Sequence, residues 1–205
     1  MDYNTIPTAD IIEKTAAALR ERGVEVTIVA DRIEALAKVK ELVPKGASVN
    51  NGSSVTLGEI GFVDYLKSNA HGWNNLHAAV IAEKDPAKQA QLRNASLFAD
   101  YYLGSVHAVA QTGEMIIASA SGSQLPPIVF TSKNLIFVVG AQKIQPTYED
   151  AMKRLREYVV PLEDARMKSG GMGGTVLAKI FTFEREPAFM GRKVRVILVG
   201  EKLGF

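Results

Sequence analysis

The chain has 205 residues, of which 47% are hydrophobic and 22% charged, and its formal net charge is +2. A chain of this length and composition can bury one sizeable core, which excludes a disordered protein. The nearly balanced charge, without a long basic run, argues against nucleic acid as the main partner. No apolar run reaches the length of a membrane span, and the first residues lack the pattern of a signal peptide. We therefore expect a cytoplasmic protein with no membrane partner.

The sequence contains no cysteine and only three histidines. The absence of cysteine excludes disulfides, thiolate zinc sites, cysteine nucleophiles and cysteine-ligated iron–sulfur clusters in this sequence. His71, His77 and His107 lack the spacing of a helical metal site, in which two ligands lie four residues apart. The sequence therefore predicts neither a metal site nor a bound cofactor.

Helical and strand patterns alternate through the first two thirds of the chain. The expected helices cover residues 7–22, 31–43, 56–68, 85–99 and 148–159, and the expected strands cover residues 24–29, 47–50, 101–110, 115–119 and 135–139. Residues 69–80 indicate a loop, and residues 125–127 contain two prolines that favour extended backbone. This alternation predicts an α/β fold with a mixed, mostly parallel sheet and helices on both faces.

The end of the chain has a different character. Residues 169–174 are rich in glycine and indicate a flexible hinge. Two further strands, over residues 175–185 and 193–199, are expected to form a β-hairpin at the edge of the main sheet. We therefore expect a single domain over residues 1–205, in which the hinge and hairpin of residues 170–205 pack on the rest.

Ligands of such sheets bind beyond the carboxyl ends of the strands. Four segments are expected to meet there: residues 50–54, 105–114, 119–124 and 140–143. Small polar residues in the first segment can cap the following helix, and free amides at a helix N-terminus favour an anionic group. We therefore expect a pocket for a small carboxylate or phosphate. The expected substrate-binding residues are Asn51, Gly52, Ser53, Ser54, Thr56, Thr112, Gly113 and Lys143.

His107 and Glu114 are the candidate catalytic residues. A histidine has a free pKa of about 6.5 and can move protons at neutral pH. Glu114, in a turn beside a strand, can act as a general base or nucleophile. Each residue also has a structural alternative, a hydrogen-bonded core histidine and an exposed turn carboxylate. Arg154, Arg156 and Arg166 are expected to form surface ion pairs.

Several segments, taken in order, resemble the LUD domain family, which is named for lactate utilisation. They are residues 51–61, 99–108, 111–114, 138–144, 154–156 with 161, 162 and 166, and 196–205. The resemblance implies a fold similar to that of the sugar-phosphate isomerase and CoA-transferase group. It also implies a role in the bacterial oxidation of lactate to pyruvate, beside iron–sulfur partner proteins.

The chain departs from these relatives at two places. Many relatives with this ending carry a cysteine-rich stretch where this chain has residues 169–175, and a redox cluster is therefore not expected here. Relatives also often place an acidic residue before the Thr-Gly pair, where this chain has Gln111.

Three functions stay open from the sequence. The first is a small-anion-binding subunit linked to the oxidation of lactate to pyruvate. The second is a stand-alone enzyme of the isomerase or acyl-transferase type that acts on a phosphorylated or nucleotide-bearing substrate. The third is a non-catalytic ligand sensor or scaffold. The sequence leaves open whether the chain is an enzyme and whether it forms a homo-oligomer.

Overall fold

The computed structural model describes residues 2–205. Its helices are α1 (Ala9–Glu21), α2 (Arg32–Leu42), α3 (Val55–Glu59), α4 (Phe62–Lys67), α5 (Leu76–Ala82), α6 (Pro86–Ala95), α7 (Tyr148–Arg154) and α8 (Val160–Ser169). Its strands are β1 (Val24–Val29), β2 (Ser48–Asn51), β3 (Asn74–Asn75), β4 (Tyr101–Gly104), β5 (Ala108–Ala110), β6 (Met115–Ser119), β7 (Asn134–Gly140), β8 (Ile144–Gln145), β9 (Lys179–Phe183) and β10 (Lys193–Val199). No helix in residues 2–205 combines the length and the apolar character of a membrane span.

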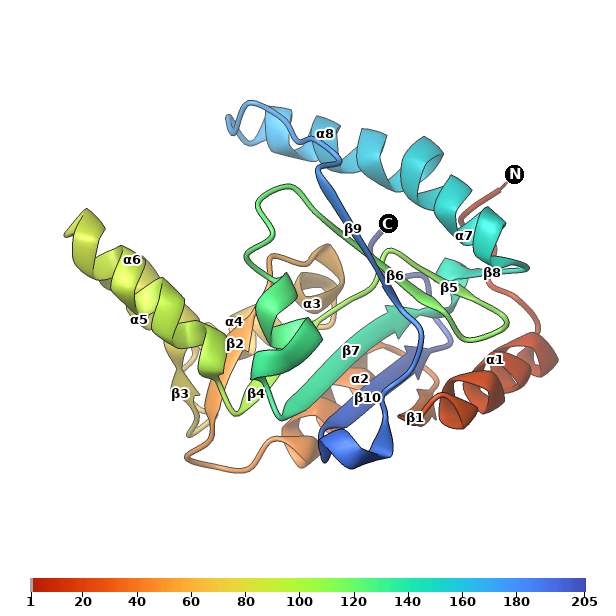
Figure 1. The fold of residues 1–205 in the computed structure, drawn as a ribbon, viewed down its shortest axis with the longest axis horizontal. Helices are drawn as coiled ribbons and strands as arrows, with labels where there is room; N and C mark the ends of the chain where they lie inside the picture. The colour runs from red at the N-terminus through yellow and green to blue at the C-terminus, as the bar shows by residue number, and fades with distance from the viewer. Residues whose placement is uncertain (1) are drawn as a thin grey trace.

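The strands form two sheets (Figure 1). The larger sheet has six strands in the order β1-β10-β7-β4-β2-β3, and all of its neighbouring strands run parallel. The smaller sheet has four strands in the order β8-β5-β6-β9 and is mostly antiparallel. The α/β class and the mostly parallel main sheet expected from the sequence are therefore confirmed.

The larger sheet is buried on both faces by different partners. Leu135, Phe137 and Val139 of β7 belong to a cluster that includes residues of α1 and the smaller sheet. The alternate residues Ile136 and Val138 belong to a second cluster with residues of α2, α3 and α4. Because successive strand residues point to opposite faces, a strand covered on both sides reads as a continuous apolar run, as β7 does.

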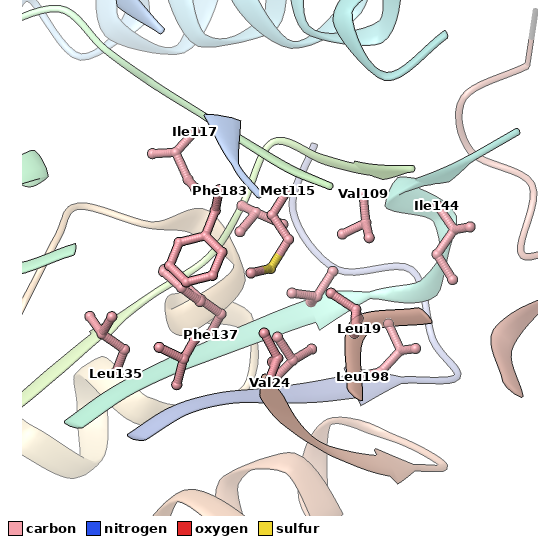
Figure 2. Close-up of a cluster of buried hydrophobic side chains, with 14 of the residues drawn as sticks. Leu19, Val24, Val109, Met115, Ile117, Leu135, Phe137, Ile144, Phe183 and Leu198 are labelled. Atoms are coloured by element: carbon pink, nitrogen blue, oxygen red, sulfur yellow. The ribbon is translucent and has the colours of Figure 1, made fainter. Parts of the chain in front are cut away.

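The two sheets pack against each other through large apolar side chains (Figure 2). Met115 and Phe183 of the smaller sheet lie over Leu135 and Phe137 of the larger one, and Leu19 of α1 extends the same cluster. The opposite face of the smaller sheet packs on α7 and the segment after it. The molecule is therefore layered as helices, larger sheet, smaller sheet and helices.

Local capping signals place the start of several helices. The Asp31 side chain accepts hydrogen bonds from the backbone N–H groups of Ile33 and Glu34 at the start of α2. Asp85 caps α6 in the same way, with Pro86 at the first helical position. Thr147 caps α7 through the N–H of Asp150. These helix starts are confirmed because they depend on residues close together in the sequence.

The expected strand over residues 101–110 is wrong as a single element. Its first half, β4, lies in the larger sheet, and its second half, β5, lies in the smaller sheet. Residues 105–107 carry the chain from one sheet to the other, and Ser105 Oγ donates a 2.7 Å hydrogen bond to the carbonyl of Val138 in β7. Both halves are apolar, so the sequence pattern does not reveal the change of sheet.

The expected C-terminal hairpin is also wrong. β9 pairs with β6 in the smaller sheet, whereas β10 lies between β1 and β7 in the larger one and is parallel to both. Val196 pairs with Val26 on one side and Phe137 on the other. The apolar run of β10 suits a central strand that is covered on both faces, and such a strand cannot remain at an edge.

Three shorter segments also differ from expectation. The helix expected over residues 56–68 is interrupted at Gly61, whose φ of 78° is left-handed, and becomes α3 and α4. The loop expected over residues 69–80 contains β3 and the start of α5. Pro126 is helical, with φ −54° and ψ −49°, and leads into a helical turn over Pro127–Thr131 instead of an extended segment.

The central position of β10 can be tested by changing Ile197, which is fully buried. Ile197→Ala is expected to lower the free energy of unfolding by about 2–5 kcal/mol in chemical denaturation, because it leaves a cavity in the core. Phe189→Ala is the control, since Phe189 is 87% exposed, and should change stability by about 0.5 kcal/mol or less. Equal, small effects of the two changes would contradict a central β10.

Candidate functional site

A cavity of about 390 Å³ lies beyond the carboxyl ends of β2, β4 and β7. One side is polar and includes Ser53, Ser54, Ser105, His107 and Lys143. Another part of the lining comes from the segment after α7, from α8 and from the chain that follows α8, and it is mostly apolar apart from Glu163, Arg166 and Thr175. Its apolar side chains are Leu155, Val159, Val160, Met167, Val176 and Leu177.

Lys143 is the buried centre of the polar side, with 3% of its surface exposed. Its ammonium Nζ donates to Thr56 Oγ1 at 3.0 Å, to Ser105 Oγ at 3.1 Å and to the carbonyl of Val106 at 3.1 Å. The three acceptors match the three N–H bonds of a lysine ammonium. Lys143 follows β7, Thr56 lies in α3 and Ser105 follows β4, so one side chain connects three segments.

Burial lowers the pKa of Lys143 to about 7, and the charge of Arg154 adds to this effect. Glu59 acts in the opposite direction, but its carboxylate accepts a hydrogen bond from the N–H of Gly204. Among residues 2–205, Lys143 forms no ion pair. A buried cation without a counter-ion loses much of its hydration, which favours its neutral form.

His107 lines the same cavity and is neutral at physiological pH. Its Nδ1 accepts a 3.1 Å hydrogen bond from the N–H of Ala118, which assigns the ring proton to Nε2. Burial and the positive charges of Lys143 and Arg154 lower the pKa of His107 to about 3, while a hydrogen bond with the backbone of Ile116 acts in the opposite direction. Within the described chain Nε2 has no hydrogen-bond partner, so this N–H is the donor that remains for a ligand.

Arg154 is fully buried behind His107, although a surface ion pair was expected. One of its Nη atoms donates to the carbonyl of His107, and the guanidinium lies 5.2 Å from the ring centre of Tyr158. Its Nε and other Nη have no partner among residues 2–205, and burial lowers its pKa to about 10. Arg154 shares one helical face with the buried residues Ala151 and Leu155. This spacing is the sequence signal that could have indicated its burial.

The other two arginines behave differently from Arg154. Arg166 forms the expected ion pair, donating to both carboxylate oxygens of Glu163 at 2.7 Å, but the pair lines the cavity. Arg156 is exposed and lies outside the lining of the cavity.

The loop after β2 reaches the cavity through Gly52, Ser53 and Ser54. Ser54 Oγ accepts from the N–H of Leu57 and so caps α3, which has only five residues. Gly52 passes so close to Tyr102 that a Cβ there would lie 2.6 Å from the tyrosine oxygen. The helix is too short to supply a strong dipole, so the positive charge of the site comes mainly from Lys143 and Arg154.

Asn51 does not line the cavity of Lys143, whereas Gly52 and Ser53 line both that cavity and a second one. Asn51 lines only the second cavity, of about 280 Å³, together with His77, Arg93 and Tyr102. The oxygens of Asn51 and Tyr102 are buried there without a hydrogen-bond partner among the described residues. The structure therefore separates Asn51 from Lys143 and the cavity that Lys143 lines.

Thr112, Gly113 and Glu114 are not brought to either cavity. They form the turn between β5 and β6, where Glu114 bonds to the guanidinium of Arg22 and to the hydroxyl of Thr112. These contacts lower the pKa of Glu114 although partial burial acts against them. The arrangement matches the structural alternative of a carboxylate held at a turn.

Ser105 is the residue that the sequence patterns did not single out. It lines the cavity and contacts Lys143 directly. The signal available was a small polar residue directly after a buried strand, within a segment already expected at the ligand-binding edge. In the described chain no group of three His, Cys, Asp or Glu residues is arranged to hold a metal ion.

Comparisons with known proteins agree with the fold. The sequence model of the LUD domain matches residues 12–199. A solved DUF162 family protein from Deinococcus radiodurans is similar with a TM-score of 0.53 and 16% sequence identity, over 95% of this chain and 99% of that one. At this identity the likeness shows the fold alone. No curated protein matches the chain. Because the LUD domain model spans nearly all of its sheets and helices, the chain belongs to the LUD domain family.

Proposed function

We propose that this chain binds a small carboxylate in the cavity beside Lys143, as a subunit linked to the oxidation of lactate to pyruvate. The observation that carries the proposal is the buried ammonium of Lys143 in the cavity lining, with the buried guanidinium of Arg154 behind His107 and no acidic partner for either among residues 2–205. A buried charge without a counter-ion is costly, and an anionic ligand offsets that cost.

The cavity offers a carboxylate direct donors as well as charge. The hydroxyl of Ser53 and the Nε2–H of His107 are donors from residues that line it. The three N–H groups of Lys143 already have acceptors, so Lys143 attracts the anion mainly through its charge, from behind the hydroxyl of Ser105. A charge in a low-dielectric cavity acts over a longer distance than in water.

Family membership supports the choice of ligand. The LUD family resemblance implies a system that oxidises lactate to pyruvate, and both compounds are small carboxylates. The same resemblance implies iron–sulfur proteins as partners, and the electrons released by the oxidation would pass to them, since this sequence has no cysteine to hold a cluster.

Lys143→Met should weaken the binding of lactate and pyruvate by at least tenfold, or about 1.4 kcal/mol, in isothermal titration calorimetry. The reason is the loss of the positive charge in the cavity lining that has no acidic partner among residues 2–205. Lys67→Met is the matched control, because the Lys67 side chain is 73% exposed and remote from the cavity lining. Lactamide, which lacks the carboxylate charge, should bind to neither the parent protein nor the variants.

Two results would contradict this proposal. One is equal binding of lactate and lactamide. The other is unchanged lactate affinity in a folded Lys143→Met protein. Binding of inorganic phosphate or a nucleotide, without binding of lactate or pyruvate, would instead favour an enzyme that acts on a phosphorylated substrate.

The affinity for lactate should fall roughly tenfold between about pH 6 and about pH 8. The pKa of Lys143 is about 7, so the ammonium form that attracts a carboxylate is the main form at the lower pH and a minor form at the higher pH. Calorimetric titrations across this range measure the effect. In Lys143→Arg, whose side chain stays charged, the affinity should not change with pH, and a similar slope in both proteins would show that another group titrates.

A further inference from the structure

We propose that Ser105 and Lys143 form a nucleophile–base pair, which gives the cavity a second activity: transfer of a small acyl group from an ester or thioester to Ser105, followed by its hydrolysis. The inference shares a cavity with the proposed function but does not require that a carboxylate binds there. The sequence brings the segments of Ser105 and Lys143 to the same edge of the sheet, but only the structure shows that the two side chains are in contact.

The geometry of the pair is that of an activated serine. Lys143 Nζ lies 3.1 Å from Ser105 Oγ, within the distance at which a base takes the proton of a hydroxyl nucleophile. Ser105 is partly exposed and lines the cavity, whereas Lys143 is almost completely buried. A substrate in the cavity therefore meets the hydroxyl first, with the amine directly behind it. Serine–lysine pairs are a known variant of the serine–histidine arrangement.

The other contacts of Lys143 leave one direction free for a lone pair. A neutral amine has two N–H bonds and one lone pair. The carbonyl of Val106 can only accept, and the hydroxyl of Thr56 has its own acceptor, the carbonyl of Leu203 at 3.4 Å. Two N–H bonds directed at these groups leave the lone pair for the hydroxyl of Ser105, once that hydroxyl turns away from the carbonyl of Val138.

The groups around Lys143 favour its neutral form. Arg154 is positively charged and His107 is neutral, so neither stabilises the ammonium form of Lys143. Glu59 favours the ammonium form, but its carboxylate already accepts a hydrogen bond from the N–H of Gly204. Its pKa of about 7 leaves a large neutral fraction at physiological pH. A catalytic base works best with a pKa near the operating pH.

The rest of the cavity supplies what acyl transfer needs. Charge develops on the carbonyl oxygen of the substrate, and the Nε2–H of His107 is a neutral donor from the same lining. The apolar wall, which includes Leu155, Val159 and Met167, suits a short hydrocarbon chain. A volume of about 390 Å³ lies within the range of small-molecule sites. The substrate class is therefore a small apolar acyl group on an alcohol or thiol.

The reaction balances without another reagent except water. Ser105 Oγ attacks the carbonyl carbon while its proton passes to Lys143 Nζ. The bond from that carbon to the alcohol or thiol then breaks, and the leaving group takes the proton from Lys143. Water, deprotonated by Lys143, attacks the acyl-serine ester, and the carboxylic acid leaves as Ser105 regains its proton.

The first test uses the parent protein, treated with an alkyl fluorophosphonate or with p-nitrophenyl butyrate and analysed by intact mass and peptide mapping. We expect one adduct per chain, located on Ser105, and a burst of p-nitrophenolate equal to the protein concentration. An adduct on another residue, or no adduct on Ser105 in the folded protein, would overturn the proposal. This result needs no variant, so a folding defect cannot obscure it.

The second test separates a base from a structural contact. Acylation of Ser105 should rise with pH through about 7, the pKa of Lys143, which is opposite to the change expected for lactate affinity. Lys143→Met should slow acylation about 100-fold or more, and Ser105→Ala should remove the adduct. Ser68→Ala and Lys67→Met are the matched controls, since both residues are exposed and absent from the cavity lining.

An acylation rate that is independent of pH and of Lys143 would overturn the proposal even if Ser105 is labelled. Failure of acylation with lactate binding intact would leave the proposed function standing, and the reverse result would remove only the proposed function.

Discussion

The buried ammonium of Lys143 is the interaction on which the arrangement of the site depends. It joins the segment after β7 to Thr56 in α3 and to Ser105 and Val106 after β4. Each of these groups lies at the carboxyl end of a parallel strand or directly beyond it. Removing the lysine would leave two hydroxyls and a carbonyl without their donor, and a buried acceptor without a donor costs stability. The same side chain thus holds the loops together and gives the cavity its charge.

This interaction is possible because the chain changes sheets at residues 105–107. β4 belongs to the larger sheet and β5 to the smaller one, and of the segment between them the N–H of His107 already donates to Ile116 of β6. Other polar groups of this segment are satisfied by specific contacts: the hydroxyl of Ser105 donates to the carbonyl of Val138, the carbonyl of Val106 accepts from Lys143, and the carbonyl of His107 accepts from Arg154. Buried backbone groups require such partners, and here the partners are two of the most buried basic side chains of the described chain.

The electrostatics of the cavity link its two proposed activities. A lysine with a pKa of about 7 is divided between a form that attracts carboxylates and a form that can accept a proton. Arg154 contributes to this division because its charge lies close by and has no acidic partner among residues 2–205. A bound carboxylate would favour the charged form of Lys143 and would therefore oppose acyl transfer. The product of acyl transfer and hydrolysis is itself a carboxylic acid, so it resembles the ligand of the first activity. The cavity is small enough for the two to compete.

The sequence by itself determined the elements whose signals are local: the strand of residues 24–29, the starts of α2, α6 and α7 at their capping residues, the apolar run of β7, and the parallel sheet that their alternation implies. It also placed Gly52, Ser53, Ser54 and Lys143 at one edge of that sheet, because the carboxyl ends of parallel strands share an edge. Only the tertiary structure decided the sheet to which β5, β9 and β10 belong, since apolar strands carry no record of their partners. It alone separated Glu114 from the cavity and buried Arg154, because hydrogen bonds between residues far apart in the chain, such as that from Lys143 to Ser105, leave no periodic pattern in the sequence.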